Sequence, residues 1–190
     1  MGVVAGQTAA IAKGQKGSCG YMSHLTIRGI QPGDTSRVNE IYNMYIVDSH
    51  VSFDTEAWTD EIRGKWLAAK VEAGYPILVA EIDGLVVGAA WAGPWRDKNA
   101  YSDSTETTVV FDSDFTGAGT GTVLYAALLE ELRTRGFHRA YAIIALPNDA
   151  SIALHRKLGY GEIGVLDEVG FKDDQYVSTM LMERNLELPV

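Results

Sequence analysis

The sequence predicts a mixed α/β (α+β) domain built on one central sheet. Segments rich in aliphatic and β-branched residues alternate with stretches whose apolar residues recur at helical spacing, in the order β-α-α-β-β-β-α-β-α-β-β. The strands expected at 77–82 and 85–91 are separated by Asp83-Gly84, a two-residue hairpin signal, so the middle of the sheet is expected to be antiparallel. With 190 residues, 46% of them hydrophobic, the chain is long enough for one domain with a sizeable core.

The elements before this hairpin are a strand and two helices. Residues 25–28 form a short strand, and Pro32-Gly33-Asp34 favours the start of a helix. A second helix is expected over about residues 59–69. The apolar residues at helical spacing are Val38, Ile41, Tyr42 and Tyr45 in the first helix, and Ile62, Trp66 and Ala69 in the second.

The elements after the hairpin alternate between strands and helices. Strands are expected at 105–111, 139–146, 160–165 and 175–183, and helices at 120–135 and 149–158. Residues 1–24 hold five glycines and show no period, so they are expected to form a flexible leader before a single domain at 25–190.

Charge and cysteine content exclude several classes of protein. Sixteen Lys and Arg against 25 Asp and Glu give a net charge of −9, which argues against a broad nucleic-acid surface. Cys19 is the one cysteine, so an internal disulfide and a cysteine-rich metal site are ruled out. Because no His, Asp or Glu set shows metal-ligand spacing and no apolar run reaches the ~20 residues of a membrane span, we expect a metal-free cytoplasmic protein.

A glycine-rich turn, Thr116-Gly117-Ala118-Gly119-Thr120-Gly121, joins a strand to a helix. Such a turn can point backbone N–H groups and the helix dipole at a phosphate or pyrophosphate. It is neither a P-loop, which needs Gly-Lys-Ser/Thr, nor the dinucleotide motif, whose third glycine is replaced by Thr122. A plain strand–helix connection remains the alternative, and Asp112 and Asp114 would repel phosphate unless they point away.

Several stretches together resemble the GNAT superfamily of acetyl-CoA-dependent N-acetyltransferases, and within it the phosphinothricin (amino-acid) N-acetyltransferases. The resemblance covers about residues 25–188, and its most specific parts are the Pro147-Asn148 segment and the Gly93-Pro94-Trp95 loop. The matching stretches are Val51-Ser52-Phe53-Asp54-Thr55-Glu56, Ala92-Gly93-Pro94-Trp95-Arg96, Asn99-Ala100-Tyr101, Thr105-Glu106-Thr107-Thr108-Val109, Leu146-Pro147-Asn148-Asp149-Ala150-Ser151, Leu154-His155 and Leu158-Gly159-Tyr160. It implies a central mixed sheet flanked by helices.

The resemblance also implies a site for acetyl-CoA. The pantetheine arm would pair with the strand backbone, from which an N–H near Val109 would stabilise the oxyanion, and the pyrophosphate would meet the glycine turn. The superfamily usually has Arg or Gln where this chain has Thr116, which leaves the backbone amides to bind the pyrophosphate. The cofactor residues so implied are Val109, Val110, Phe111, Thr116, Gly117, Ala118, Gly119, Thr120, Gly121, Thr122, Asn148 and Ser151.

Two residues are candidates for the chemistry. A primary amine is mostly protonated at neutral pH, so acetyl transfer needs a base, and the resemblance places the family's catalytic carboxylate at Glu106. His155 is the second candidate, because it lies where many relatives carry a tyrosine as general acid. A solvated strand-face glutamate and a packed or capping histidine are the alternatives.

The acceptor is expected to meet the loop after residue 93. Arginine binds a carboxylate or phosphinate in bidentate fashion, and the loop's aromatic residues could wall the side chain. An exposed loop with its aromatics packed on the sheet is the alternative. The substrate-binding candidates are Phe53, Trp95, Arg96, Lys98, Tyr101 and Thr107.

The acceptor implied is a small amino acid such as phosphinothricin, methionine sulfone or methionine sulfoximine, and the resemblance further implies a homodimer. An acetyltransferase for a polyamine or a protein N-terminus stays open, although Arg96 and Lys98 speak against a polyamine. A non-catalytic acyl-CoA-binding module is the third hypothesis. No nucleic-acid or membrane partner is expected.

Overall fold

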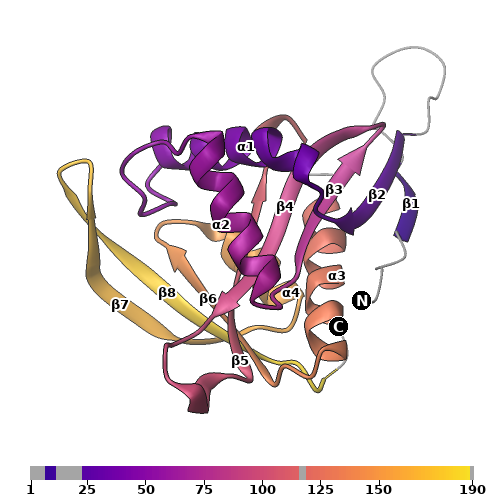
Figure 1. Cartoon of the computed structure of the whole chain (residues 1–190). Helices are drawn as coiled ribbons and strands as arrows, with labels where there is room; N and C mark the ends of the chain where they lie inside the picture. The colour runs from indigo at the N-terminus through magenta and orange to yellow at the C-terminus, as the bar shows by residue number, and fades with distance from the viewer. Residues whose placement is uncertain (1–6, 12–22, 116–118, 189–190) are drawn as a thin grey trace.

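A computed structural model describes residues 7–11, 23–115 and 119–188, which form one eight-stranded sheet (Figure 1). The strand order is β1-β2-β3-β4-β5-β6-β8-β7, and every neighbouring pair is antiparallel except β5 and β6. The predicted mixed α/β fold with one central sheet is confirmed. The strands are β1 (Gln7–Ile11), β2 (Ser23–Gly29), β3 (Ile77–Ile82), β4 (Leu85–Pro94), β5 (Ser104–Phe111), β6 (Arg139–Ala145), β7 (Gly161–Lys172) and β8 (Gln175–Asn185).

Helices cover both faces of this sheet and bury separate parts of the core. One face carries α1 (Thr35–Val47) and α2 (Asp60–Glu72), packed on β3, β4 and β5. The other carries α3 (Thr120–Thr134) and α4 (Asp149–Lys157). Leu124, Leu128, Leu129 and Leu132 of α3 are fully buried in the core on this face of the sheet. Short 3₁₀ turns occupy Pro32–Asp34, Asn99–Tyr101 and Ser113–Phe115.

The structure differs from the sequence prediction at the two ends of the sheet. Residues 7–11, expected to lie in a flexible leader, form β1 and pair antiparallel with β2. β7 runs to Lys172 and not to 165, and it turns into β8 through Asp173 and Asp174, both with positive φ. The extension escaped detection because β7 is exposed along most of its length and therefore lacks the apolar–polar alternation of a half-buried strand.

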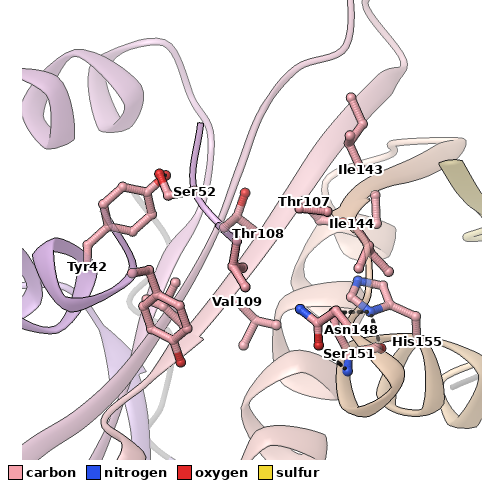
Figure 2. A pocket seen from close by; sticks show the side chains of 15 residues that line it. Tyr42, Ser52, Thr107, Thr108, Val109, Ile143, Ile144, Asn148, Ser151 and His155 are labelled. Carbon is pink, nitrogen blue, oxygen red and sulfur yellow. Dashed lines mark hydrogen bonds between the residues drawn. The ribbon is translucent and has the colours of Figure 1, made fainter. Parts of the chain in front are cut away.

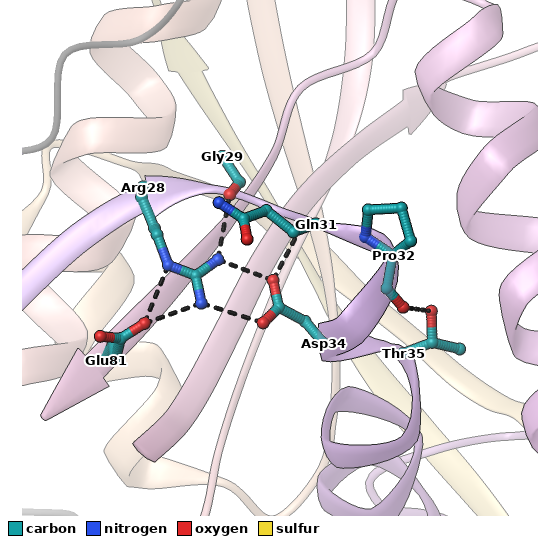
Figure 3. Close-up of polar contacts among 7 residues, drawn as sticks. All are labelled: Arg28, Gly29, Gln31, Pro32, Asp34, Thr35 and Glu81. Atoms are coloured by element: carbon teal, nitrogen blue, oxygen red, sulfur yellow. Dashed lines mark hydrogen bonds and ion pairs between the residues drawn. The ribbon is translucent and has the colours of Figure 1, made fainter. Parts of the chain in front are cut away.

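An arginine on β2 ties the start of α1 to the sheet (Figure 3). Arg28 donates to both carboxylate oxygens of Asp34, at 2.7 and 2.9 Å, and its Nε donates to Glu81 of β3 at 2.9 Å. Bidentate pairing fixes the angle of the guanidinium and not just its distance. The Arg28–Asp34–Glu81 cluster thus sets the direction of α1. The Tyr45 side chain of this helix bonds Phe111 of β5.

The parallel pair β5 and β6 stays together only briefly. The two strands pair from Ser104 to Glu106 against Arg139 to Tyr141, and the pairing ends there. Thr107 continues the contact through its hydroxyl, which donates to the carbonyl of Tyr141 at 3.0 Å. Beyond this point the edge of β5 is open to other partners, which places a gap in the middle of the sheet.

Candidate active site

Glu106 points into a cavity of about 300 Å³ between β5 and α2, called here the Glu106 cavity. Alternate side chains of a strand face opposite sides of the sheet, so Glu106 and Thr108 face α2 while Thr107 faces α3. The cavity is rich in aromatic rings and charged groups. Its lining residues are Tyr42, Asp54, Trp58, Arg63, Trp66, Lys70, Trp91, Gly93, Pro94, Glu106 and Thr108.

Burial raises the pKa of the Glu106 carboxyl, and the positive charges of Lys70 and Arg96 act in the opposite direction. The first effect is the larger one. A carboxylate with a raised pKa is a stronger base than one in water, while the two cations help it stay ionised. The surroundings of Glu106 therefore suit proton abstraction, and the alternative of a solvated strand-face glutamate does not match its burial.

α2 supplies two cations to this cavity that the sequence analysis missed. The Arg63 guanidinium is buried and lies over two aromatic rings. Its Cζ is 4.4 Å from the centre of the Tyr42 ring and 4.1 Å from the centre of the Trp58 ring. Lys70 Nζ lies 4.6 Å from the centre of the Trp66 ring. Residues 63, 66 and 70 are three and four positions apart and share one helix face. That spacing was the available signal, since it places two cations on the face that carries Trp66.

A second, smaller pocket of about 90 Å³ lies at the gap between β5 and β6 (Figure 2). Tyr42 and Ser52 lie on one side of it and Asn148, Ser151 and His155 on the other. Its lining residues are Tyr42, Tyr45, Val51, Ser52, Thr107, Thr108, Val109, Val110, Ala142, Ile143, Ile144, Ala145, Asn148, Ser151 and His155. Among the residues predicted for the cofactor, the pocket brings together Val109, Val110, Asn148 and Ser151.

At this gap the backbone of Phe111 bonds the Tyr45 side chain, whereas the backbone of Val109 faces the gap. The Tyr45 hydroxyl donates to the Phe111 carbonyl at 2.7 Å and accepts from its N–H at 3.2 Å. Backbone groups of a strand point to one side at every second residue, so Val109 presents its groups to the same side as Phe111. Val109 therefore faces the gap with its backbone, whereas the groups of Phe111 already bond Tyr45.

His155 lies in a buried hydroxyl network on the α3 face, opposite Glu106. Its Nδ1 lies 2.7 Å from the carbonyl of Ser151, which can only accept, so Nδ1 carries the hydrogen. Nε2 is then an acceptor for the Tyr125 hydroxyl at 3.0 Å. Burial lowers the pKa of His155, in keeping with a neutral ring. Both ring nitrogens are thus engaged inside the protein.

Thr107 belongs to the same network and not to the Glu106 cavity. Its hydroxyl lies 2.7 Å from the hydroxyls of Tyr125 and Tyr160, and its side chain is buried. Although it was predicted to bind substrate, Thr107 joins β5 to α3 and to the start of β7. Period-two alternation along β5 is the physical reason, because Thr107 must face away from Glu106.

The glycine-rich turn is described from Gly119 onward, and the predicted cofactor residues Thr116, Gly117 and Ala118 lie outside the described residues. Gly119 has a φ of +79° and directly precedes α3. Thr120 is buried, and its Oγ1 has no hydrogen-bond partner in the described part of the chain. Gly121 lies against the Phe111 ring, and Thr122 stands in the first turn of α3.

Asp112, expected to repel a phosphate unless turned away, is buried and ion-paired with Arg37 of α1. Its Oδ1 also accepts from the backbone N–H of Asp114 at 3.0 Å. The arginine offsets this negative charge before the turn begins. At the other side of the gap, Asn148 Oδ1 caps α4 by accepting from the Ser151 N–H at 3.1 Å.

The predicted acceptor loop is held to the sheet by one aromatic contact. Trp95 stacks on Tyr141 with ring centres 4.3 Å apart, and the Arg96 guanidinium lies 4.4 Å from the Trp95 ring. Lys98 and Tyr101 are exposed beyond it. Phe53 is 41% exposed and reaches Gly170 of β7. Of these residues, Arg96 acts on Glu106 through its positive charge, although its own side chain is exposed.

Within the described residues, no cluster of three or more His, Cys, Asp or Glu side chains could hold a metal ion. No helix there is both long and apolar enough to cross a membrane.

Comparisons with known proteins agree with this geometry. The acetyltransferase (GNAT) family matches residues 38–160. Phosphinothricin N-acetyltransferase of Streptomyces viridochromogenes is 38% identical, covering 87% of this chain and 90% of its own. The L-methionine sulfoximine/L-methionine sulfone acetyltransferase of Salmonella typhimurium is 31% identical, covering 86% and 95%.

A solved structure has the same fold. The GNAT superfamily phosphinothricin acetyltransferase of Sinorhizobium meliloti, in complex with acetyl-CoA, superposes with a TM-score of 0.82 at 27% identity, covering 85% of this chain and 88% of its own. The family match and the shared fold define an acetyl-transfer enzyme. This chain belongs to the GNAT family of acetyltransferases, and its relatives include phosphinothricin and methionine sulfoximine/sulfone N-acetyltransferases.

Proposed function

We propose that this protein transfers the acetyl group of acetyl-CoA to the α-amine of a small amino-acid-like acceptor, with Glu106 as general base. The observation that carries the proposal is Glu106 itself, half-buried in a cavity beside cationic side chains. The names of the relatives point to the same acceptor class, that of phosphinothricin and methionine sulfone or sulfoximine.

The residues at the gap fit acetyl-CoA. The N-terminus of α3 offers backbone N–H groups to a ligand. Gly119, which precedes it with a positive φ, places no side chain in the turn. The buried Thr120 hydroxyl lacks a hydrogen-bond partner among the described residues. Val109 would hold the arm along β5, with Asn148 and Ser151 on the opposite wall. Acetyl-CoA supplies the acetyl group as an activated thioester.

Glu106 would take one proton from the acceptor ammonium and leave the neutral amine as nucleophile. The nitrogen would then bond to the acetyl carbon as the carbon–sulfur bond breaks, and the second proton lost from the nitrogen would neutralise the departing thiolate. The backbone N–H of Val109 would steady the negative charge that develops on the acyl oxygen. The positive charges of Lys70 and Arg96 favour the ionised form of Glu106 and oppose the effect of its burial. His155 would act from the other face of the sheet, and its two occupied nitrogens favour a supporting role over direct proton transfer.

A homodimer in the cytoplasm completes the proposal. β7 is an edge strand whose outer side pairs with no other strand among the described residues. It carries apolar side chains that are 44–58% exposed: Ile163, Val165, Leu166, Val169 and Phe171. Exposed apolar edges of this kind usually mark an association surface. The cytoplasmic location is supported by the single cysteine of the chain.

An acetylation assay tests the proposed function. Purified protein with acetyl-CoA is offered phosphinothricin, methionine sulfone, methionine sulfoximine, the common amino acids, spermidine and an N-terminal peptide, and the thiol released is measured. We expect turnover with phosphinothricin, methionine sulfone or methionine sulfoximine, and little with spermidine. Fastest turnover of spermidine or the peptide would assign the enzyme to another acceptor class. Binding of acetyl-CoA without turnover of any amine would instead support a non-catalytic module.

A further inference from the structure

Arg63 brings an unsatisfied donor to the wall of the Glu106 cavity. Its side chain is 1% exposed, and its Nε donates to Asn39 Oδ1 at 3.3 Å. Its Nη2 is buried and has no hydrogen-bond partner among the described residues. A buried charged donor without an acceptor lowers the free energy of unfolding, and such donors commonly bind a ligand or a water.

Lys70 brings spare donors to the same cavity. Its Nζ donates to the Ala92 carbonyl at 3.3 Å, which uses one of the three hydrogens of the ammonium. Gly93 leaves room for it, because a Cβ at that position would collide with Nζ. The ion pairs within the described part of the chain involve neither Lys70 nor Arg63. Two cations therefore face one cavity without a carboxylate bound to either.

We propose that Arg63 and Lys70 form an anion subsite that binds the α-carboxylate of the acceptor while its α-amine meets Glu106. The inference rests on the proposed function and makes it more specific. Amine and carboxylate share one carbon in an α-amino acid, so whatever binds the carboxylate must lie in the same cavity as the base. Arg96 and Lys98, on the loop beyond, are then left for the distal polar end of the acceptor.

The charges of the cavity fit a zwitterion. Asp54 and Glu106 are its carboxylates and Arg63 and Lys70 its cations, so the formal charges cancel. An acceptor with an ammonium and a carboxylate can satisfy both signs. A simple amine or a polyamine would leave the two cations unpaired, and burial would make that costly. The subsite therefore favours amino acids over amines.

A pair of acceptors that differ only in the carboxylate tests this subsite. They are L-methionine sulfone and 3-(methylsulfonyl)propylamine, its decarboxylated analogue. We expect the wild type to prefer the amino acid by at least about 100-fold in kcat/KM, the scale for a site whose polar groups would otherwise stay unpaired. Lys70→Met should cut that preference at least tenfold, mainly through a higher KM for the amino acid. Any change in the basicity of Glu106 affects both acceptors and cancels from the ratio.

Arg63→Lys keeps the charge and removes Nη2, and it should also lower the preference. Lys65→Met, an exposed lysine on the same helix, is the matched control and should leave the ratio unchanged. Thermal unfolding and acetyl-CoA binding show whether each variant is folded. Arg96→Met provides the competing outcome: if it abolishes the preference while Lys70→Met and Arg63→Lys retain it, the proposal is overturned.

Calorimetry separates this inference from the proposed function. If the wild type acetylates neither acceptor, the proposed function fails, but the subsite is still tested by titrating methionine sulfone and its amine into the protein with acetyl-CoA present. Tighter binding of the amino acid that is lost in Lys70→Met supports the subsite. Equal binding of the two compounds, or binding of neither, overturns it.

Discussion

At the residue scale, the two faces of β5 carry polar side chains with different surroundings. Glu106 faces α2 and lies near two cations, while Thr107 faces α3 and binds three other hydrogen-bonding groups. The same strand thus holds a candidate base on one face and a structural hydroxyl on the other. His155 joins the second set, which separates it from Glu106 by the thickness of the sheet.

Glu106→Gln should lower kcat/KM by roughly 10²–10⁴-fold, the usual effect of losing a general base. The deficit should shrink as pH rises, because more of the acceptor is then already neutral. In the wild type, burial raises the pKa of Glu106, so activity should fall as the pH drops through that raised value. The variant should lack this acidic limb. A pH series of initial rates measures both effects.

Glu61→Gln is the control, since Glu61 lies on the exposed side of α2 in an ion pair with Lys65. It should behave as wild type at every pH. Full activity of Glu106→Gln at pH 7 would refute the assignment and direct attention to His155 or a water chain.

At the element scale, the segment between α1 and α2 is anchored by the end of β7. Lys172 is 4% exposed, and its Nζ donates to the carbonyls of Ile46, Ser49 and Ser52 at 2.6, 2.7 and 2.8 Å. Ile46 lies in the last turn of α1, where the helix dipole also favours a positive charge. Phe53 contacts Gly170 on the same strand. This segment carries Ser52 and Asp54 into the two pockets, so the anchor shapes both.

Lys172→Met should destabilise the protein by at least about 2 kcal/mol, the scale for buried carbonyls left without a donor. It should also raise KM for the acceptor more than it lowers kcat, because Glu106 is untouched while the segment beside it loosens. Thermal unfolding and steady-state kinetics test both points. Lys65→Met removes an exposed lysine and should change neither. Wild-type stability and KM in Lys172→Met would show that the anchor has no effect on the site.

At the scale of the whole molecule, the sheet ends in two different edges. One edge is β1, and the other is β7, whose long hairpin with β8 extends from the body of the protein (Figure 1). The apolar side chains of β7 are unusual for a surface strand. A second copy of the chain would cover them and satisfy the free edge.

Light scattering should therefore give the mass of a dimer, and Val169→Asp should give a monomer. Val169 is 55% exposed, so the aspartate costs the isolated fold little, while a like charge at a symmetric interface repels its mate. Val47→Asp, on a comparably exposed valine of α1, is the matched control and should stay dimeric. A wild-type monomer at micromolar concentration would contradict the proposed assembly.

The local elements of this protein and its family can be predicted from the amino-acid sequence alone. Helical spacing located α3 and its buried leucines, Asp83-Gly84 located the β3–β4 hairpin, and the quoted stretches indicated an acetyltransferase. These features depend on neighbours in the chain or on short motifs, so local patterns carry them.

The assembly of the site, in contrast, depends on contacts that exist only in the folded chain. Arg63 and Lys70 of α2 line the same cavity as Glu106 of β5, and Lys172 reaches Ser52 across 120 residues of chain. Thr107 and His155 lie on the face opposite Glu106 because side chains alternate along a strand and α4 packs on that other face. Such contacts join residues that are far apart in sequence, and no local pattern records them, because they arise when helices and sheet bury their apolar faces together.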